Sequence, residues 1–190
     1  MCLSMDRRKK YTKMVLKDSF LKLLNQKQLS SITVKEICQL ADINRSTFYS
    51  HYSDQYDLLY KMEEEIIADM NKYLNDCNLT KEEESLEVTE KLMEYIVENK
   101  EVCQTLLGEN GDAAFLKKVM VVAKKNIIDN GFFGQPLHQD TAQYLSTFIV
   151  SGSIYVIKSW LANGMDKTPK ELAIMINSFA KQGINSLLID

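Results

Sequence analysis

The side chains best suited to directed polar contacts gather within residues 45–51. They combine a guanidinium, two hydroxyls and two aromatic rings with polar edges, carried by Arg45, Ser46, Thr47, Tyr49 and His51. Such groups hydrogen-bond base edges and phosphates in a DNA groove. Phe48 lies among them as an apolar residue, so we expect it to point inward while its neighbours form a surface for nucleic acid. The alternative is a helical hairpin with a polar rim and no DNA partner.

Two short helices are predicted to position these side chains. Thr33 and Glu36 form a T-x-x-E capping box, which starts a first helix. This helix should end near Ala41, because Asp42 tolerates a turn conformation, and Asn44 is a suitable N-cap for a second helix over residues 45–51. The second helix is too short to persist on propensity alone, so it must pack on a neighbour. The pattern is that of a helix-turn-helix with its recognition helix second.

At these positions the sequence resembles the tetracycline-repressor (TetR/AcrR) family of transcription regulators. The family has a T-V-x-x-I-A-x-x-A-G-V-S-x-x-T-F-Y-x-x-F-like run, then a helix beginning K-x-x-L. The residues that fill matching places here are Thr33, Val34, Ile37, Ala41, Ile43, Thr47, Phe48, Tyr49, Tyr52, Leu58 and Leu59. The resemblance is specific over about residues 7–62. It implies an N-terminal DNA-binding domain, a fourth helix that passes movement to it, and a dimer built from the last two long helices.

Three residues depart from the family pattern. Asp42 replaces the turn glycine, Cys38 follows the first-helix isoleucine, and Gln55 replaces a lysine that contacts phosphate. Gln55 removes a charge-assisted contact and bears on affinity more than on fold. We expect DNA contacts from Lys10, Thr33, Arg45, Ser46, Thr47, Tyr49, His51, Tyr52 and Gln55.

Composition predicts an all-α protein with an asymmetric charge. The 190 residues are 45% hydrophobic and 26% charged, with only two prolines and seven glycines to make the turns of a β fold. Residues 1–62 hold 11 Lys or Arg against 6 Asp or Glu, a net charge of +5. Because the whole chain has a net charge of −3, the remaining residues carry −8. A basic N-terminal third on an acidic body suggests that one end meets a polyanion. A solvated basic helix is the alternative for the charge split alone.

Neither enzymatic nor metal chemistry is indicated. Cys2, Cys38, Cys77 and Cys103 form no C-x-x-C pair and no zinc spacing with the two histidines. No phosphate-binding, hydrolase or metalloprotease motif occurs, so we expect no catalytic residue, no metal and no cofactor. The basic N-terminus has no apolar segment behind it, which argues against a secretory signal and favours reduced thiols in the cytoplasm.

The rest of the chain is expected to be a series of helices. Residues 1–6 should be a loose arm, and a supporting helix should follow from Lys10 to about residue 26. A long helix should begin at a Ser53 or Asp54 cap and run through Leu74. Further helices are expected at about 84–99, 100–107, 112–130, 138–163 and 169–188, with 75–84 as a loop. Residues 131–137, GFFGQPL, are either a lid or a turn.

Residues 141–157 contain no charged side chain. Their 17 residues fall short of the roughly 20 needed to cross a bilayer, so we expect no membrane span and instead a helix buried on most sides. Together with an apolar stripe that includes Met175 and Phe179 in the last helix, this predicts a homodimer. An effector pocket, or equally well packed core, is predicted from Met93, Phe115, Met120, Tyr144, Phe148, Tyr155 and Trp160.

The sequence therefore predicts an N-terminal three-helix DNA-binding domain at residues 7–53, with the helix-turn-helix at 33–52. A long helix joins it to a larger helical ligand-binding and dimerisation domain at 54–190. The predicted function is a ligand-responsive regulator, more specifically a repressor, that binds a palindromic double-stranded DNA operator as a homodimer and responds to an unknown small-molecule effector. The alternative is a helical adaptor protein that keeps the helix-turn-helix as a scaffold, which Gln55 favours.

Overall fold

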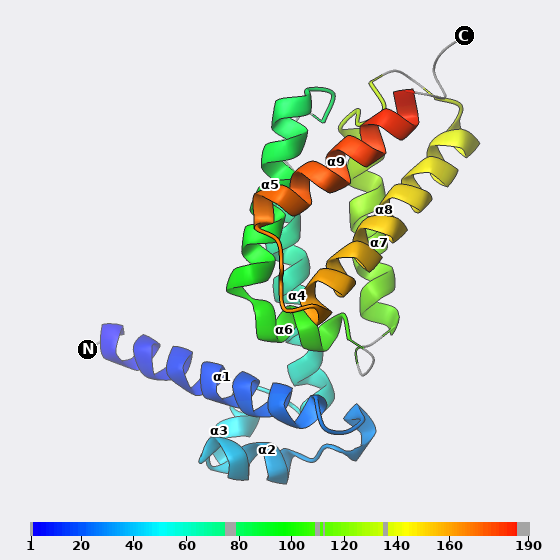
Figure 1. The fold of residues 1–190 in the computed structure, drawn as a ribbon. Helices are drawn as coiled ribbons and strands as arrows, with labels where there is room; N and C mark the ends of the chain where they lie inside the picture. Colours follow the sequence, from blue (N-terminus) through cyan, green and yellow to red (C-terminus); the bar gives the residue numbers. More distant parts are fainter. Residues whose placement is uncertain (1, 75–78, 109–110, 112, 135–136, 186–190) are drawn as a thin grey trace. The chain divides into compact units, whose positions relative to one another are not determined.

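The computed structural model describes residues 2–74, 79–108, 111, 113–134 and 137–185, and these contain α-helices and no strand (Figure 1). The helices are α1 (Cys2–Leu24), α2 (Val34–Ala41), α3 (Arg45–Tyr49), α4 (Gln55–Leu74), α5 (Glu82–Glu98), α6 (Lys100–Leu106), α7 (Ala113–Asp129), α8 (Gln139–Ala162) and α9 (Pro169–Asn185); a 3-10 turn covers Leu29–Ser31. The all-α prediction is confirmed. The predicted tail of the last helix beyond residue 185 lies outside the described residues, as do residues 75–78 of the loop predicted at 75–84. The rest of that range is a turn at 79–81, followed by the start of α5 at Glu82.

Local capping defines the helix-turn-helix as predicted. The backbone N–H of Glu36 donates to Thr33 Oγ1 at 3.3 Å, and the N–H of Thr33 donates to Glu36 Oε2 at 3.0 Å. Asp42 adopts the left-handed conformation, with φ 52° and ψ 42°, and ends α2. Asn44 Oδ1 accepts the N–H of Ser46 at 3.0 Å and starts α3. The turn therefore forms without the glycine found in the resembling family.

The N-terminal arm differs from the prediction. α1 begins at Cys2 instead of near Lys10, so residues 2–6 continue the helix. The physical reason lies in the sequence, because residues 2–9 contain no glycine or proline and include leucine, methionine, arginine and lysine, which favour helix.

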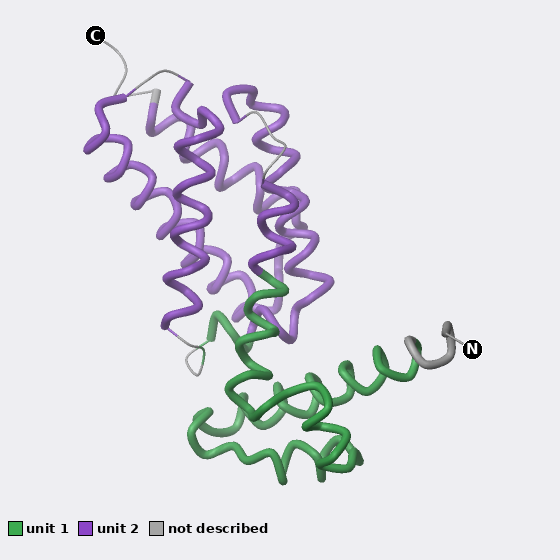
Figure 2. The backbone as a smooth tube through the Cα atoms, turned by 180° about the vertical axis from the view of Figure 1, so that it is seen from behind, with its two compact units in different colours: residues 1–66, 105–111 green, residues 67–104, 112–190 purple. Residues whose placement is uncertain are grey.

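The chain divides into two compact units (Figure 2). The first comprises residues 1–66 and 105–111. Its core consists of fully buried side chains contributed by α1, α2, α3 and α4: Leu16, Phe20, Leu24, Ile37, Phe48 and Leu58. Lys17 of α1 forms an ion pair with Glu65 of α4. Thr105 Oγ1 donates to Asn25 Oδ1 at 3.0 Å, which ties the C-terminal end of α6 to the residue after α1.

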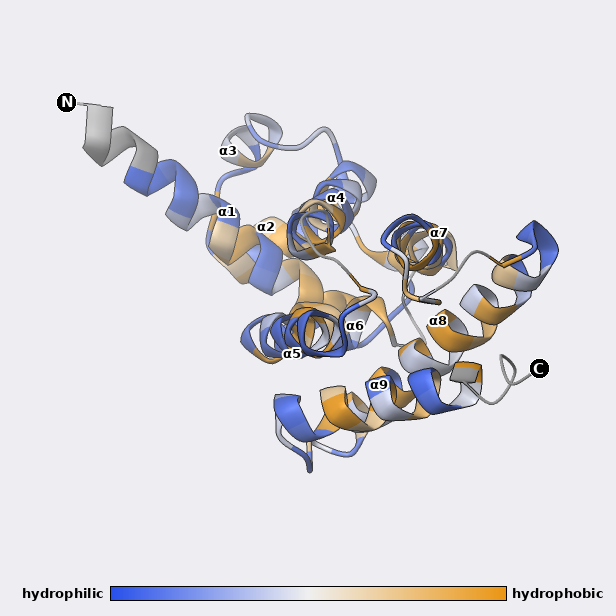
Figure 3. Ribbon diagram, turned by 90° about the horizontal axis from the view of Figure 1, so that it is seen from above, coloured by the Kyte–Doolittle hydropathy of each residue, from blue (hydrophilic) through white to orange (hydrophobic). Residues whose placement is uncertain are grey.

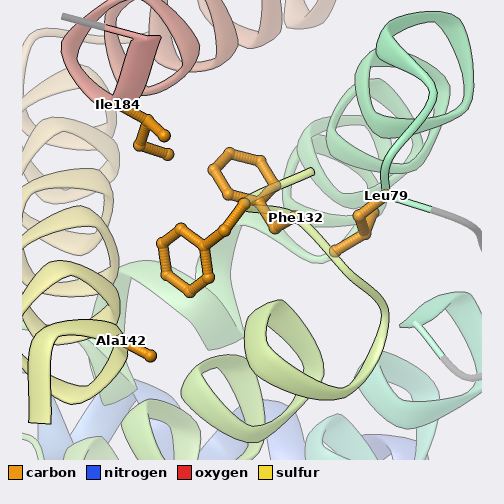
Figure 4. Packing of buried hydrophobic residues seen from close by; sticks show 5 residues of the cluster. Leu79, Phe132, Ala142 and Ile184 are labelled. Atoms are coloured by element: carbon orange, nitrogen blue, oxygen red, sulfur yellow. The ribbon is translucent and has the colours of Figure 1, made fainter. Parts of the chain in front are cut away.

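The second unit, residues 67–104 and 112–190, contains two hydrophobic clusters. One joins α5, α8 and α9 through Met93, Trp160, Leu172 and Ala173. The other surrounds the turn after α7 and consists of Leu79, Phe132, Phe133, Ala142 and Ile184 (Figure 4). A buried hydrogen bond from Ser85 Oγ to Asn177 Oδ1, at 2.7 Å, links α5 to α9.

The glycine-bearing segment after α7 is a turn anchored in the core. Phe132 and Phe133 are buried with their rings edge-on at 6.1 Å, so the described part, 131–134, does not form a lid. Gly131 and Gly134 have positive φ, which glycine adopts without strain. Lys181 of α9 donates to the carbonyls of Phe132 and Leu79, at 2.7 and 2.8 Å, and so fastens this turn to α9.

α8 corrects the prediction of a helix buried on most sides. Its buried residues, including Ala142, Ser146 and Val150, recur every four positions and so occupy one face. The opposite face exposes Tyr144, Phe148 and Tyr155. The helix has 24 residues, which by length and composition alone is enough to cross a membrane, with 28% of its most apolar window buried. The uncharged run of 17 residues is therefore shorter than the helix that contains it, and its length does not exclude a membrane span.

Candidate nucleic-acid interface

α3 presents polar side chains outward from one buried anchor. Phe48 is fully buried, and its ring lies 5.6 Å from those of Tyr49 and Tyr52. Arg45 and Ser46 are exposed, and Tyr49 is 56% exposed. This arrangement explains how a helix from Arg45 to Tyr49 persists, since packing of Phe48 replaces the stability that helix length would otherwise give.

The remaining predicted contact residues differ in their exposure. Lys10 is exposed on α1, Thr47 and His51 are half-buried, and Gln55 is half-buried as the first residue of α4. Thr33 is exposed, but its hydroxyl bonds to Glu36 within the capping box. All of these residues belong to the first unit.

Tyr52 has a different environment from the one expected of a contact residue. Its side chain is 3% exposed and packs on Phe48. Burial, followed by the charges of Glu65 and Asp57, raises the pKa of Tyr52 to about 12. Since almost none of its surface reaches solvent, Tyr52 supports α3 from within the core.

Lys13 and Lys61 lie near His51, as does Lys9 of the basic run at residues 7–10, and none of the three is among the predicted contact residues. Burial lowers the pKa of His51, and the charges of Lys13, Lys9 and Lys61 lower it further. Lys61 Nζ donates to the carbonyl of His51 at 3.0 Å and to Asp57 at 2.9 Å, and lies 5.3 Å from the centre of the Tyr52 ring. Helical spacing could have revealed Lys9 and Lys13, whereas the role of Lys61 depends on how α3 packs on α4.

The residues predicted to line an effector pocket are not gathered in this chain. Met93 and Trp160 share one cluster, and Phe115 is buried. In contrast, Tyr144, Phe148 and Tyr155 are 78%, 68% and 66% exposed on α8. Met120 is half-buried on α7. The error arose because an uncharged sequence does not reveal which aromatic side chains face inward.

The cysteines whose side chains are described are reduced and buried. Burial raises the pKa of Cys103 to about 12 and raises that of Cys38, where the charge of Arg45 partly opposes the effect. Thiolate character is therefore low at both positions. Cys77 and the side chain of Cys2 lie outside the described residues. Among the residues that the structure describes, no group of three His, Cys, Asp or Glu side chains could hold a metal ion.

Known proteins resemble this chain in its fold and in the sequence of its C-terminal half. The family model TetR_C_8, described as a transcriptional regulator C-terminal region, matches residues 83–182. The uncharacterized HTH-type transcriptional regulator YxbF of Bacillus subtilis (strain 168) is 32% identical over 90 residues, covering 44% of this chain and 24% of that protein. The chain thus matches about a quarter of the length of this relative.

Two solved structures resemble the chain over nearly all of its length. A TetR transcriptional regulator from Streptococcus agalactiae 2603V has a TM-score of 0.66 at 24% identity, with 95% of this chain and 99% of that chain covered. The transcriptional regulator FadR from Bacillus subtilis, solved with stearoyl-CoA, has a TM-score of 0.65 at 14% identity, with 90% and 98% covered. At these identities, the likeness shows the fold.

Proposed function

Because the chain belongs to the TetR family of transcriptional regulators, which are helix-turn-helix proteins and not enzymes, we propose that it is a ligand-responsive repressor that binds a palindromic operator as a homodimer. The family itself implies DNA binding and a response to a ligand. Repression, operator symmetry and the identity of the contact residues are specific to the proposal. We assign DNA binding to residues 7–53 and regulation with dimerisation to residues 54–190, in the cytoplasm.

The observation that carries the proposal is the two-sided character of α3. Phe48 fixes the helix from inside, while Arg45, Ser46 and Tyr49 are available to a groove. Arginine can donate two hydrogen bonds to a guanine edge, and a tyrosine hydroxyl can donate to a phosphate. We therefore assign base reading to Arg45 and backbone contact to Tyr49. Tyr52 is assigned a supporting role.

Dimerisation is supported by exposed apolar side chains on α8 and α9. Tyr144, Phe148 and Tyr155 recur on one face of α8, and Met175 and Phe179 are exposed on α9, with Phe179 at 74%. Aromatic residues in such number on a soluble monomer would be an association site. A second copy of the same chain, related by two-fold symmetry, would bury this face against its own equivalent. The dimer would also present two copies of α3, as a palindromic operator requires. On this proposal, the exposed face of α8 meets protein and not lipid.

The effector is proposed to bind within residues 54–190, among the helices that the family model covers. The stearoyl-CoA in the FadR structure belongs to that protein, and the present chain shares its fold at 14% identity. We therefore assign this chain a small-molecule effector without a chemical class. Mass spectrometry of ligands released from the purified protein would identify it.

Arg45→Ala and Tyr49→Ala test the assignment of α3. Affinity for a duplex selected by the wild type would be measured by fluorescence anisotropy at several salt concentrations. Arg45→Ala should cost about 1–3 kcal/mol and relax preference at one base pair, whereas Tyr49→Ala should weaken selected and random duplexes alike. Tyr49→Phe, which keeps the ring, should behave as Tyr49→Ala if the hydroxyl makes the contact. Wild-type affinity in both alanine variants would remove the assignment, and no salt-dependent DNA binding at all would favour the adaptor alternative.

A further inference from the structure

The inward-facing stripe of α1 changes from apolar to basic along the helix. Leu16, Phe20 and Leu24 are fully buried and lie four residues apart. Residues three or four apart share one face of a helix, so the same stripe continues toward the N-terminus as Lys13 and Lys9. In Figure 3, α1 is blue in the turns that follow its grey N-terminal end, and orange segments mix with blue ones toward its C-terminal end. Thr12, which is buried, lies between the two lysines, so the exposed Lys9 and Lys13 border the side of α1 that packs on the helix-turn-helix.

The positive charges of these two lysines act on His51, next to the end of α3. Their charges lower the pKa of His51, together with burial, which has the larger effect, and with Lys61. His51 directly follows the turn that ends α3. Lys9 and Lys13 are both exposed, so their ammonium groups remain available to a partner that approaches α3.

Three other lysines of the first unit are neutralised by carboxylates. Lys27 pairs with Glu36 at 2.6 Å, Lys61 pairs with Asp57 at 2.9 Å, and Lys17 pairs with Glu65. Among the side chains that the structure describes, no carboxylate forms an ion pair with Lys9 or Lys13. Two exposed cations that no described carboxylate neutralises favour an external anion. At the end of a DNA-reading helix, that anion is the phosphate backbone.

We propose that Lys9 and Lys13 form a phosphate clamp that binds the DNA backbone beside the C-terminal end of α3. The inference rests on the proposed DNA binding and assigns to α1 part of its electrostatic affinity. It also explains how the chain can do without a lysine at Gln55, because two cations from α1 replace the charge missing at the start of α4. The clamp positions α3 but reads no base, so it should act equally on every sequence.

The test compares single lysine-to-glutamine variants of the same helix. Lys9→Gln and Lys13→Gln each remove one charge from the inward stripe, whereas Lys22→Gln removes one from an exposed position two residues from both Phe20 and Leu24, and so from another face. Affinity would be measured by fluorescence anisotropy on a selected and a random duplex at salt concentrations from about 50 to about 300 mM. Phosphate contacts weaken strongly over this range. Thermal melts would verify that each variant is folded.

We expect the slope of log affinity against log salt to become less steep by about 0.9 per subunit in each single variant and by about 1.8 in the double variant. The ratio of selected to random affinity should stay unchanged, and Lys22→Gln should match the wild type. A wild-type slope in the double variant, while Arg45→Ala still loses affinity, would overturn the clamp and leave the proposed function standing. Absence of salt-dependent binding in the wild type would overturn both.

Discussion

Glu36 shows how one residue at the start of α2 both completes the cap of its helix and holds the loop that follows α1. Its carboxylate accepts the N–H of Thr33 at 3.0 Å and the Thr33 hydroxyl at 2.8 Å, and it pairs with Lys27 at 2.6 Å. The hydrogen bond from Lys27, followed by those from Thr33, lowers the pKa of Glu36 from 4.5 to about 2. A lowered folded-state pKa means that the ionised carboxylate stabilises the fold.

This pKa gives a prediction about stability and pH. The stabilisation by Glu36 should be fully present above about pH 4.5 and should be lost as the pH falls toward 2, because the unfolded chain then binds the proton first. Glu36→Gln should therefore lower the melting temperature at about pH 6. The difference from the wild type should shrink at about pH 4 and about pH 3, which lie between the unfolded-state pKa of 4.5 and the folded-state pKa of about 2. Glu94→Gln, an exposed glutamate of α5, serves as the charge-matched control. A difference that does not change with pH would show that the carboxylate charge has no part in the cap.

Residue roles that depend on neighbours in the chain could be predicted, and roles that depend on packing could not. The Thr33 and Asn44 caps follow from spacing of two or three residues. In contrast, the burial of Tyr52 and the contact of Lys61 with the His51 carbonyl arise only when α3 and α4 pack together. No local pattern distinguishes a tyrosine that faces DNA from one that fills a core.

At the scale of elements, the turn between α2 and α3 depends on one left-handed residue. Asp42 has φ 52°, a conformation that costs an ordinary L-residue roughly 1–2 kcal/mol and that Asp, Asn and Gly adopt more readily. The turn therefore retains its geometry although the family glycine is missing.

Substitutions at Asp42 should follow this conformational preference. Asp42→Asn and Asp42→Gly should keep the free energy of unfolding within about 0.5 kcal/mol of the wild type, whereas Asp42→Ala should lower it by about 1 kcal/mol. Urea unfolding followed by circular dichroism measures the order. Equal stability of the alanine and glycine variants would mean that residue 42 is not held in the left-handed conformation.

Helix positions were predictable because capping residues, glycine stops and apolar periodicity act locally. Thr168 and Glu171 form a second capping box at the start of α9, and Gly131 and Gly164 have the positive φ expected of helix stops. The buried face of α8 was not predictable, since apolar side chains occur all round it. Packing on α7 and α9 decides which of them face inward.

At the scale of the whole molecule, the exposed face of α8 should hold two copies of the chain together. Gly152 lies on the same side as Tyr144, Phe148 and Tyr155, and a Cβ added there would meet no atom of its own chain. Gly152→Glu should therefore give a monomer by light scattering while helicity is retained. Gln143→Glu adds the same charge at another exposed position of α8 and should remain dimeric. A dimeric Gly152→Glu variant would exclude this face as the interface.

The central claim is that two copies of α3 read a symmetric DNA sequence. Its most direct test is selection of duplexes from a random library by the wild-type protein and by Arg45→Ala, followed by sequencing of the bound pool. The wild type should enrich a palindrome whose half-sites lie about one or two helical turns apart, and Arg45→Ala should lose preference at one symmetric pair of positions. Enrichment of no sequence, or of an asymmetric site that is unaffected by Arg45→Ala, would contradict the account.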